Sequence, residues 1–264
     1  MGRRAKDKVA SFSVAVLSLL FALPLVLILG QVTFRGAIAL GKGLFSELLP
    51  AFCGTILLSV LALVFSVPWG VAVGLFLSEV RGTFPLAVDV AVGVLHGVPT
   101  IVVGVVVYLW VVKPFGGFSA LSGACALALI MLPSVVKATK ESVDLVPNEL
   151  REASYALGAS YSSTLLRVVL PSALSGITTG VLVGLSRAMG ETAPLLFTAF
   201  GNPYLNLNPL KPVDALPLLI FNYAMSPYES WHEVAHAASF VLVAMVFLVN
   251  MLVRFVEARW RVRF

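Results

Sequence analysis

Two charged residues that could bind an ionic solute, Arg187 and Glu191, stand four positions apart in a long apolar stretch of the sequence. Three glycines precede them at helical spacing, namely Gly176, Gly180 and Gly184. In a single helix over residues 173–200, all five residues would lie within an arc of roughly 80°, because each residue advances an α-helix by about 100°. We therefore expect one stripe in which the glycines allow close helix packing and the charged pair contacts a partner or a solute.

The apolar surroundings of Arg187 limit what this side chain can do. An isolated arginine near the middle of a bilayer costs on the order of 3 kcal/mol on insertion scales, so its guanidinium must face a partner or a wet cavity. One interpretation is a salt bridge between helices. The other is an anion pathway lined by Arg187, in which Glu191 limits how tightly the anion is held, because a transported solute must leave as well as bind. The two residues alone leave both interpretations open.

The composition indicates an integral membrane protein. Of the 264 residues, 59% are hydrophobic and only 12% are charged, whereas a soluble domain carries about a quarter charged residues. The net charge of +5 comes from basic residues at the ends of apolar segments, which favours a role in membrane topology over nucleic-acid binding. We identify no nucleophile–base or metal-ligand constellation, so the composition and the motifs argue against an enzyme acting alone.

Six apolar stretches are long enough to cross a bilayer as helices. They cover residues of about 9–30, 52–77, 86–112, 118–136, 173–200 and 236–256. We expect a break in the third stretch at Gly97-Val98-Pro99, because proline lacks the N–H that a helix needs. The predicted fold is an all-α membrane protein with six transmembrane helices. Residues 1–50 hold a tail, the first span and an outside linker, residues 51–256 form the transmembrane domain, and residues 257–264 form a second tail.

The distribution of basic residues predicts the orientation of the chain. Thirteen of the eighteen lysines and arginines fall on one side of these spans and four on the other, with Arg187 inside a span. Loops rich in lysine and arginine stay in the cytoplasm. Both termini and the loop 137–172 are therefore expected in the cytoplasm, and the loop 201–235 is expected outside.

The loop 137–172 has the pattern of two short helices joined at a glycine. Pro147 interrupts the preceding helix, and a short helix is expected over Asn148–Leu157. Gly158 can supply the left-handed turn that ends it. A second helix is expected over Thr164–Leu170, capped by Ser162 and Ser163, before Pro171 begins the next span.

This loop also carries a spaced motif: Glu152-Ala153-Ser154, three residues, Gly158, nine residues, then Val168-x-Leu170-Pro171. The motif resembles the signature of permease subunits of ABC importers, with serine in place of the usual second alanine and valine in place of isoleucine. The resemblance implies a type I importer permease fold and a coupling helix that inserts into a cytoplasmic ATPase. It assigns the coupling to Glu152, Ala153, Gly158, Leu170 and Pro171. The chain has no complete nucleotide-binding motif, so ATP and Mg would be used by a separate ATPase and no cofactor is expected here.

A second resemblance narrows the family. The run Ser186–Ala199, which contains both Arg187 and Glu191, resembles the fifth span of PstA-type permease subunits of phosphate importers, and Ala215–Tyr223 resembles their outside loop. This resemblance implies ATP-driven import of phosphate across a prokaryotic cytoplasmic membrane. It also implies a second related permease, two copies of the ATPase and an outside phosphate-binding protein as partners within the lipid bilayer and at its surfaces.

Other functions remain open at this point. A related permease could carry another oxyanion such as molybdate or sulfate. An ion-coupled secondary transporter or channel would work without an ATPase, but it would favour more intramembrane acids than the few in these spans. A membrane scaffold or signalling subunit would not need Arg187 for solute uptake.

Overall fold

The computed structural model describes the backbone of residues 3–260 and the side chains of residues 11–255, and this part of the chain is almost entirely helical. The prediction of an all-helical membrane protein is confirmed. Five helices are long and apolar enough to span a membrane, and a sixth span is possible if one bent pair is counted. Within the described residues the only β-pairing is an isolated bridge between Phe200 and Val213.

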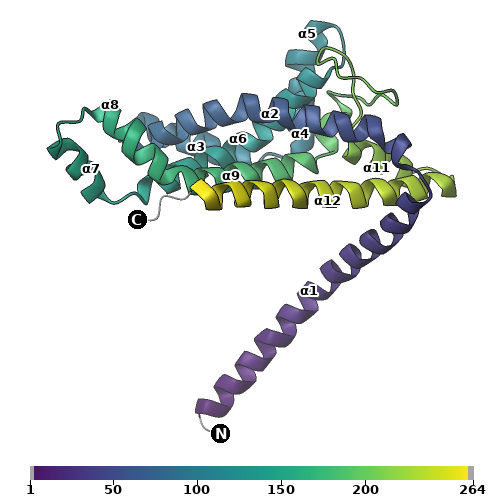
Figure 1. Ribbon diagram of the computed structural model, residues 1–264, viewed down its shortest axis with the longest axis horizontal. Helices are drawn as coiled ribbons and strands as arrows, with labels where there is room; N and C mark the ends of the chain where they lie inside the picture. The colour runs from purple at the N-terminus through teal and green to yellow at the C-terminus, as the bar shows by residue number, and fades with distance from the viewer. Residues whose placement is uncertain (1–2, 261–264) are drawn as a thin grey trace.

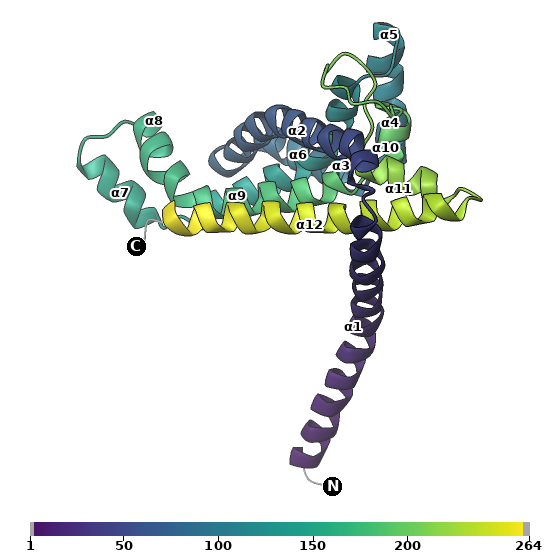
Figure 2. The ribbon, with the colours of Figure 1, turned by 45° about the vertical axis from the view of Figure 1, so that its right-hand side comes forward.

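Helices α2, α6, α9 and α12 lie side by side, with α6 in the centre between α2 and α9, and with α12 against α9 (Figure 1). A short elbow, α7 and α8, lies at one end of this bundle, and the short helices α4, α5, α10 and α11 lie toward the other end (Figures 1 and 2). The long helices are α1 (Arg3–Gly41), α2 (Phe45–Glu79), α3 (Thr83–Gly97), α6 (Ala120–Asp144), α9 (Leu170–Met189) and α12 (Glu229–Trp260). The short ones are α4 (Thr100–Val107), α5 (Lys113–Phe115), α7 (Asn148–Ala156), α8 (Tyr161–Thr164), α10 (Ala193–Leu196) and α11 (Leu216–Ala224), with π-helical turns at Tyr108–Val112 and Leu165–Val169.

The helix α1 continues well past the end expected near residue 30. It reaches Gly41, and only Lys42–Leu44 separate it from α2, so most of the expected outside linker is helical. The turn comes where Gly43 adopts a left-handed φ of +85°, which glycine tolerates without steric cost. Outside its C-terminal part, α1 stands away from the bundle (Figures 1 and 2), and its most apolar window has none of its residues buried.

The stretch expected as the third span is sharply bent. The helices α3 and α4–α5 meet at 103° across Val98 and Pro99. Val98 is extended, with φ −65° and ψ 132°, because the proline ring excludes the α conformation from the residue before it. The break predicted at Gly97-Val98-Pro99 is therefore present, and it separates two helices that point in different directions.

Small residues allow the central helices to approach closely. A Cβ at Gly70 of α2 would lie 2.6 Å from Val135 of α6, and one at Gly74 would lie 2.5 Å from Thr139. Such distances are far below van der Waals contact, so only glycine fits at this crossing. The residues of α6 at the centre of the bundle, such as Leu127 and Met131, are buried.

Two other helix ends differ from the expected spans. The helix α6 continues beyond residue 136 to Asp144, and α12 begins at Glu229 instead of near residue 236. Ser119 and Ser122 form a reciprocal capping box at the start of α6, a contact that fixes a helix N-terminus. The expected tail 257–264 is helical as far as Trp260, and its remaining residues lie outside the described part of the chain.

Candidate functional site

The first helix of the elbow agrees with the sequence pattern. The helix α7 covers Asn148–Ala156, and Gly158 follows it with a left-handed φ of +81°. A hydrogen bond of 2.9 Å between the buried hydroxyls of Ser154 and Thr164 joins α7 to α8. The two short helices are therefore held at a defined angle, which the turn at Gly158 makes possible.

The second half of the elbow differs from the prediction. The helix α8 begins at Tyr161, and its cap is Ser160, whose side chain accepts the N–H of Ser163. The chain then runs through the π-helical turn Leu165–Val169 directly into α9, with no break at Pro171. A π-turn widens the helix locally, and this leaves room for a proline that has no N–H and whose ring crowds the preceding turn.

The elbow exposes apolar side chains at its surface. Leu157 is 89% exposed, Leu166 is 58% exposed and Tyr155 is 43% exposed. Three of the five predicted coupling residues, Glu152, Ala153 and Gly158, lie exposed on the elbow. The other two lie where α9 begins, with Pro171 exposed and Leu170 half-buried.

Glu79, which the sequence analysis did not single out, links the elbow to the bundle. It is the last residue of α2. One carboxylate oxygen lies 2.7 Å from Nη1 of Arg151 on α7, and the other accepts a 2.8 Å hydrogen bond from the hydroxyl of Tyr161 on α8. Both short helices are thereby tied to one carboxylate at the end of a long helix. The contacts join residues 72 and 82 positions apart, so no local sequence pattern could have indicated them.

The expected helical stripe over 173–200 is wrong at its C-terminal end. The helix α9 ends at Met189, and the N–H of Gly190 closes the last turn on the carbonyl of Arg187. Glu191 therefore lies outside the helix. The chain then enters the short helix α10, which begins at Ala193 and has Pro194 in its first turn. This helix packs so closely on α4 that a Cβ at Gly104 would lie 2.6 Å from Cα of Pro194.

Arg187 and Glu191 are nevertheless close in space. Nε of Arg187 lies 3.6 Å from Oε1 of Glu191, which is an ion pair longer than a hydrogen bond. The Arg187 side chain is 40% exposed and that of Glu191 is 16% exposed. The guanidinium therefore keeps donors free for another partner.

The three glycines of α9 lie against α6. A Cβ at Gly180 would lie 2.0 Å from Cβ of Ala138, and one at Gly176 would lie 2.1 Å from the Ser142 hydroxyl. At Gly184 the contact is looser, 3.4 Å from Cβ of Ser134. The close approach of α9 to α6 thus spans the two turns from Gly176 to Gly184, and Arg187 follows one turn later.

Two further basic side chains lie near Arg187. His96 of α3 is within electrostatic range of both Lys137 of α6 and Arg187 of α9. The His96 side chain is exposed, and among the described residues it makes no hydrogen bond. Three helices therefore each bring one basic side chain to the same region of the bundle, with Glu191 as the acidic group paired to Arg187.

The comparisons with known proteins agree with this architecture. Residues 66–262 match the family model of the binding-protein-dependent transport system inner membrane component. A phosphate transport system permease protein PstA of Xylella fastidiosa (strain 9a5c) is 40% identical over 82% of this chain and 80% of its own length. A probable phosphate transport system permease protein PstA of Methanocaldococcus jannaschii is 38% identical over 99% of this chain and 95% of its own length.

Solved structures share the fold at low sequence identity. A bacterial ABC transporter involved in the import of the acidic polysaccharide alginate is 13% identical, with a TM-score of 0.67 over 98% of this chain and 99% of that chain. The MetNI methionine ABC transporter in an inward-facing conformation is 18% identical, with a TM-score of 0.64 over 83% of this chain and 96% of that chain. The family match and the relatives, one of them matched over nearly its full length, confirm the resemblance inferred from the motifs. The chain belongs to the inner membrane components of binding-protein-dependent transport systems, and within that family to the PstA permease proteins.

Proposed function

We propose that this chain is the membrane-spanning permease subunit of an ATP-driven importer that carries inorganic phosphate into the cytoplasm. The observation that carries this proposal is the similarity to phosphate transport permeases of the PstA type, which extends over 99% of the chain in one relative. Membership of this family argues against an ion-coupled secondary transporter and against a scaffold without transport.

The cationic region around Arg187 is the proposed path of the anion. Arg187 offers planar guanidinium donors that match the oxygens of phosphate. Lys137 and His96 add two more donors from neighbouring helices. Glu191, 3.6 Å from Arg187, opposes this positive charge and keeps the affinity low enough for release.

The elbow α7–α8 is the proposed contact with the ATPase. Its exposed Leu157 and Leu166 are apolar surface that water does not solvate well, so a partner protein that covers them gains hydrophobic free energy. Movement of the elbow would reach α2 through Glu79 and α9 through the continuous π-turn. Both helices adjoin the region of Arg187, and this supplies a route from the ATPase to the anion path.

The proposed assembly contains two ATPase copies, a second related permease and an extracytoplasmic phosphate-binding protein. The second permease would cover the exposed face of α1, which contacts little of its own bundle. The binding protein would face the segment between α10 and α11. The assembly lies in a prokaryotic cytoplasmic membrane, with the elbow and both termini on the cytoplasmic side.

ATP-dependent uptake of labelled phosphate into vesicles tests this function. We expect the reconstituted complex to take up phosphate. Arg187→Gln should reduce this uptake by at least about tenfold, because the main hydrogen-bond donor to the anion is lost. The subunits of this variant should still copurify. Arg81→Gln is the matched control, because Arg81 is exposed between α2 and α3 and makes no ion pair among the described residues. Uptake of labelled sulfate or molybdate in place of phosphate would overturn the proposed specificity.

A further inference from the structure

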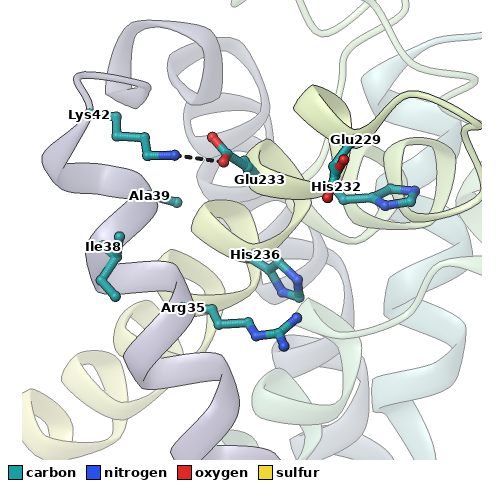
Figure 3. Close-up of a pocket in the computed structure, with 8 residues that line it drawn as sticks. All are labelled: Arg35, Ile38, Ala39, Lys42, Glu229, His232, Glu233 and His236. Atoms are coloured by element: carbon teal, nitrogen blue, oxygen red, sulfur yellow. Dashed lines mark hydrogen bonds and ion pairs between the residues drawn. The ribbon is translucent and has the colours of Figure 1, made fainter.

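A polar cavity lies between α1 and α12 (Figure 3). These two helices meet at the end of the bundle opposite the elbow (Figure 1). The volume of the cavity is about 280 Å³, several times the roughly 30 Å³ that one water molecule occupies in the liquid. The lining residues are Arg35, Ile38, Ala39, Lys42, Glu229, His232, Glu233 and His236.

The cavity is separate from the proposed anion path. Asn250 of α12 donates a 2.8 Å hydrogen bond to Ser186, the neighbour of Arg187. His236 lies fourteen residues earlier on the same helix, which is roughly 21 Å at 1.5 Å per residue. A ligand in this cavity therefore would not contact Arg187.

The close approach of the two helices brings Arg35 next to His236. Gly36 packs against α12, where an added Cβ would lie 2.4 Å from Cβ of Phe240 and 2.7 Å from the carbonyl oxygen of His236. Arg35 precedes this contact, and Figure 3 shows its guanidinium beside the imidazole of His236. The packing at Gly36 thus fixes the separation between these two basic side chains.

Three of the other polar lining side chains, Lys42, Glu233 and His232, already have partners. Nζ of Lys42 lies 2.6 Å from Oε1 of Glu233, so these two groups neutralise each other at one side of the cavity (Figure 3). Nε2 of His232 lies 2.8 Å from the carbonyl oxygen of Ser226. Within the described side chains, Arg35 has no ion pair and His236 has no side-chain hydrogen bond.

A phosphoryl oxyanion fits Arg35 and His236, the two donor groups that remain without a side-chain partner among the described residues. The arginine fork donates parallel N–H bonds to two oxygens of a tetrahedral anion, and an imidazole N–H can donate to a third. Glu229 is seven residues from His236 on α12, roughly 10 Å along the helix, so it does not stand between the anion and these donors. Ile38 and Ala39 give the cavity an apolar side, which suits the glycerol or acyl part of a lipid.

A metal site is the competing interpretation. The run His232-Glu233-x-x-His236 has the spelling of a zinc motif on a helix, which the sequence analysis passed over. Here the Glu233 carboxylate is held by Lys42, and the guanidinium beside His236 would repel a cation. Among the residues whose side chains are described, no group of three histidine, cysteine, aspartate or glutamate side chains could hold a metal ion.

We propose that Arg35 and His236 form a binding site for a phosphoryl oxyanion between α1 and α12, supplied either by a lipid headgroup or by free phosphate. The two sources share one chemistry and differ in what else must bind. A lipid would place its glycerol and the adjoining acyl carbons beside Ile38 at the apolar side of the cavity, whereas free phosphate would need only the polar side.

Two binding measurements on the purified complex test this site and identify the source. In the lipid arm, the delipidated complex is titrated with phosphatidylglycerol and with diacylglycerol of the same acyl chains, and bound lipid is counted by native mass spectrometry. In the phosphate arm, the complex in phosphate-free glycolipid nanodiscs is titrated with labelled inorganic phosphate by equilibrium dialysis. Each arm compares the wild type with Arg35→Gln, His236→Gln and Lys113→Gln.

We expect Arg35→Gln to weaken the binding of either phosphatidylglycerol or inorganic phosphate by about tenfold. His236→Gln should weaken the binding of the same probe by a smaller factor. Lys113→Gln removes the same charge from an exposed position of α5 and should leave binding unchanged. The probe whose binding Arg35→Gln weakens identifies the source of the oxyanion, lipid headgroup or free phosphate. Arg35 is exposed and unpaired among the described residues, so the variant should assemble normally, which gel filtration checks. Wild-type affinity of Arg35→Gln in both arms, or an equal loss in Lys113→Gln, would overturn the proposal.

Discussion

The guanidinium of Arg151 on the elbow lies 2.7 Å from the carboxylate of Glu79 at the end of α2, and both side chains are mostly buried, with exposures of 19% and 12%. A second contact, from the Tyr161 hydroxyl to the same carboxylate, adds α8 to this junction. A mostly buried carboxylate that contacts two partners resists displacement more than the carboxylate of an exposed ion pair does. Glu79 is therefore placed to transmit movement of α7 and α8 to the transmembrane bundle.

Glu79→Gln should uncouple ATP hydrolysis from transport. The amide keeps the size of the side chain but removes the charge that holds Arg151, and loss of one partner of a partly buried pair costs about 1–3 kcal/mol. We expect ATPase association to survive while phosphate transported per ATP hydrolysed falls several-fold. Glu141→Gln is the control, because Glu141 is exposed on α6 and unpaired among the described residues. An unchanged transport ratio would show that the junction does not carry coupling.

Gly158→Ala should weaken binding of the ATPase. The φ of +81° at Gly158 is unfavourable for a residue with a Cβ by about 1–2 kcal/mol. No atom lies within 4 Å of the position where that Cβ would be, so the whole effect comes from the backbone. The elbow should relax to another angle, and we expect about fivefold to tenfold weaker copurification of the ATPase.

Gly93→Ala is the matched control for Gly158→Ala. Gly93 also has open space around its missing Cβ but lies in the helix α3 with no left-handed φ. The same substitution should be harmless there, because alanine favours a helix over glycine. Equal binding of the ATPase by the wild type and both variants would contradict a role for the left-handed turn.

Gly180→Ala should separate α9 from α6. The added Cβ would lie 2.0 Å from Cβ of Ala138, and overpacking of this kind typically costs about 1–3 kcal/mol. Thermal unfolding of the purified chain should show a lower Tm. Gly180→Ala combined with Ala138→Gly should recover most of the loss, because the second change removes the atom that clashes. A double variant as unstable as the single one would show that the clash is not the cause.

The sequence predicted those features that depend on local backbone chemistry. Pro99 and Gly158 act on their own dihedral angles and on those of immediate neighbours, so the bend between α3 and α4 and the turn after α7 could be recognised without a partner segment. The six apolar stretches likewise follow from hydropathy alone. The family resemblance in Ser186–Ala199 was also visible, because it depends on residue identity.

The features that the sequence missed depend on tertiary contacts. The stripe through Arg187 and Glu191 assumed a helix to residue 200, whereas α9 ends at Met189 and α10 packs on Gly104, some ninety residues away in the chain. The predicted ion pair is nevertheless present, because the turn after α9 places Glu191 beside Arg187. Glu79 and the Arg35–His236 cavity join segments far apart in sequence, and no local pattern carries that information.

Asp214 should make the stability of the permease depend on pH. This residue lies in the segment between α10 and α11, and its burial raises the carboxyl pKa from 3.8 to about 6. Only a hydrogen bond of 2.8 Å from the backbone N–H of Ala215 opposes that effect. Because the folded state holds the proton more tightly than the unfolded state, the native protein binds more protons between pH 3.8 and about 6, and stability falls as pH rises through this window. Above pH 6 the penalty of a buried carboxylate is fully present.

Asp214→Asn removes that penalty, because the amide is neutral and its oxygen can still accept the N–H of Ala215. We expect the Tm of this variant to exceed that of the wild type at pH 8 and to equal it at pH 4, as measured by thermal unfolding of the purified chain in detergent. The exposed Glu141→Gln, which also removes one negative charge, should show no such difference between the two pH values. A Tm gain for Asp214→Asn that is the same at pH 4 and pH 8 would contradict titration of Asp214 as its source, since a buried carboxyl that is already protonated gains nothing from neutralisation.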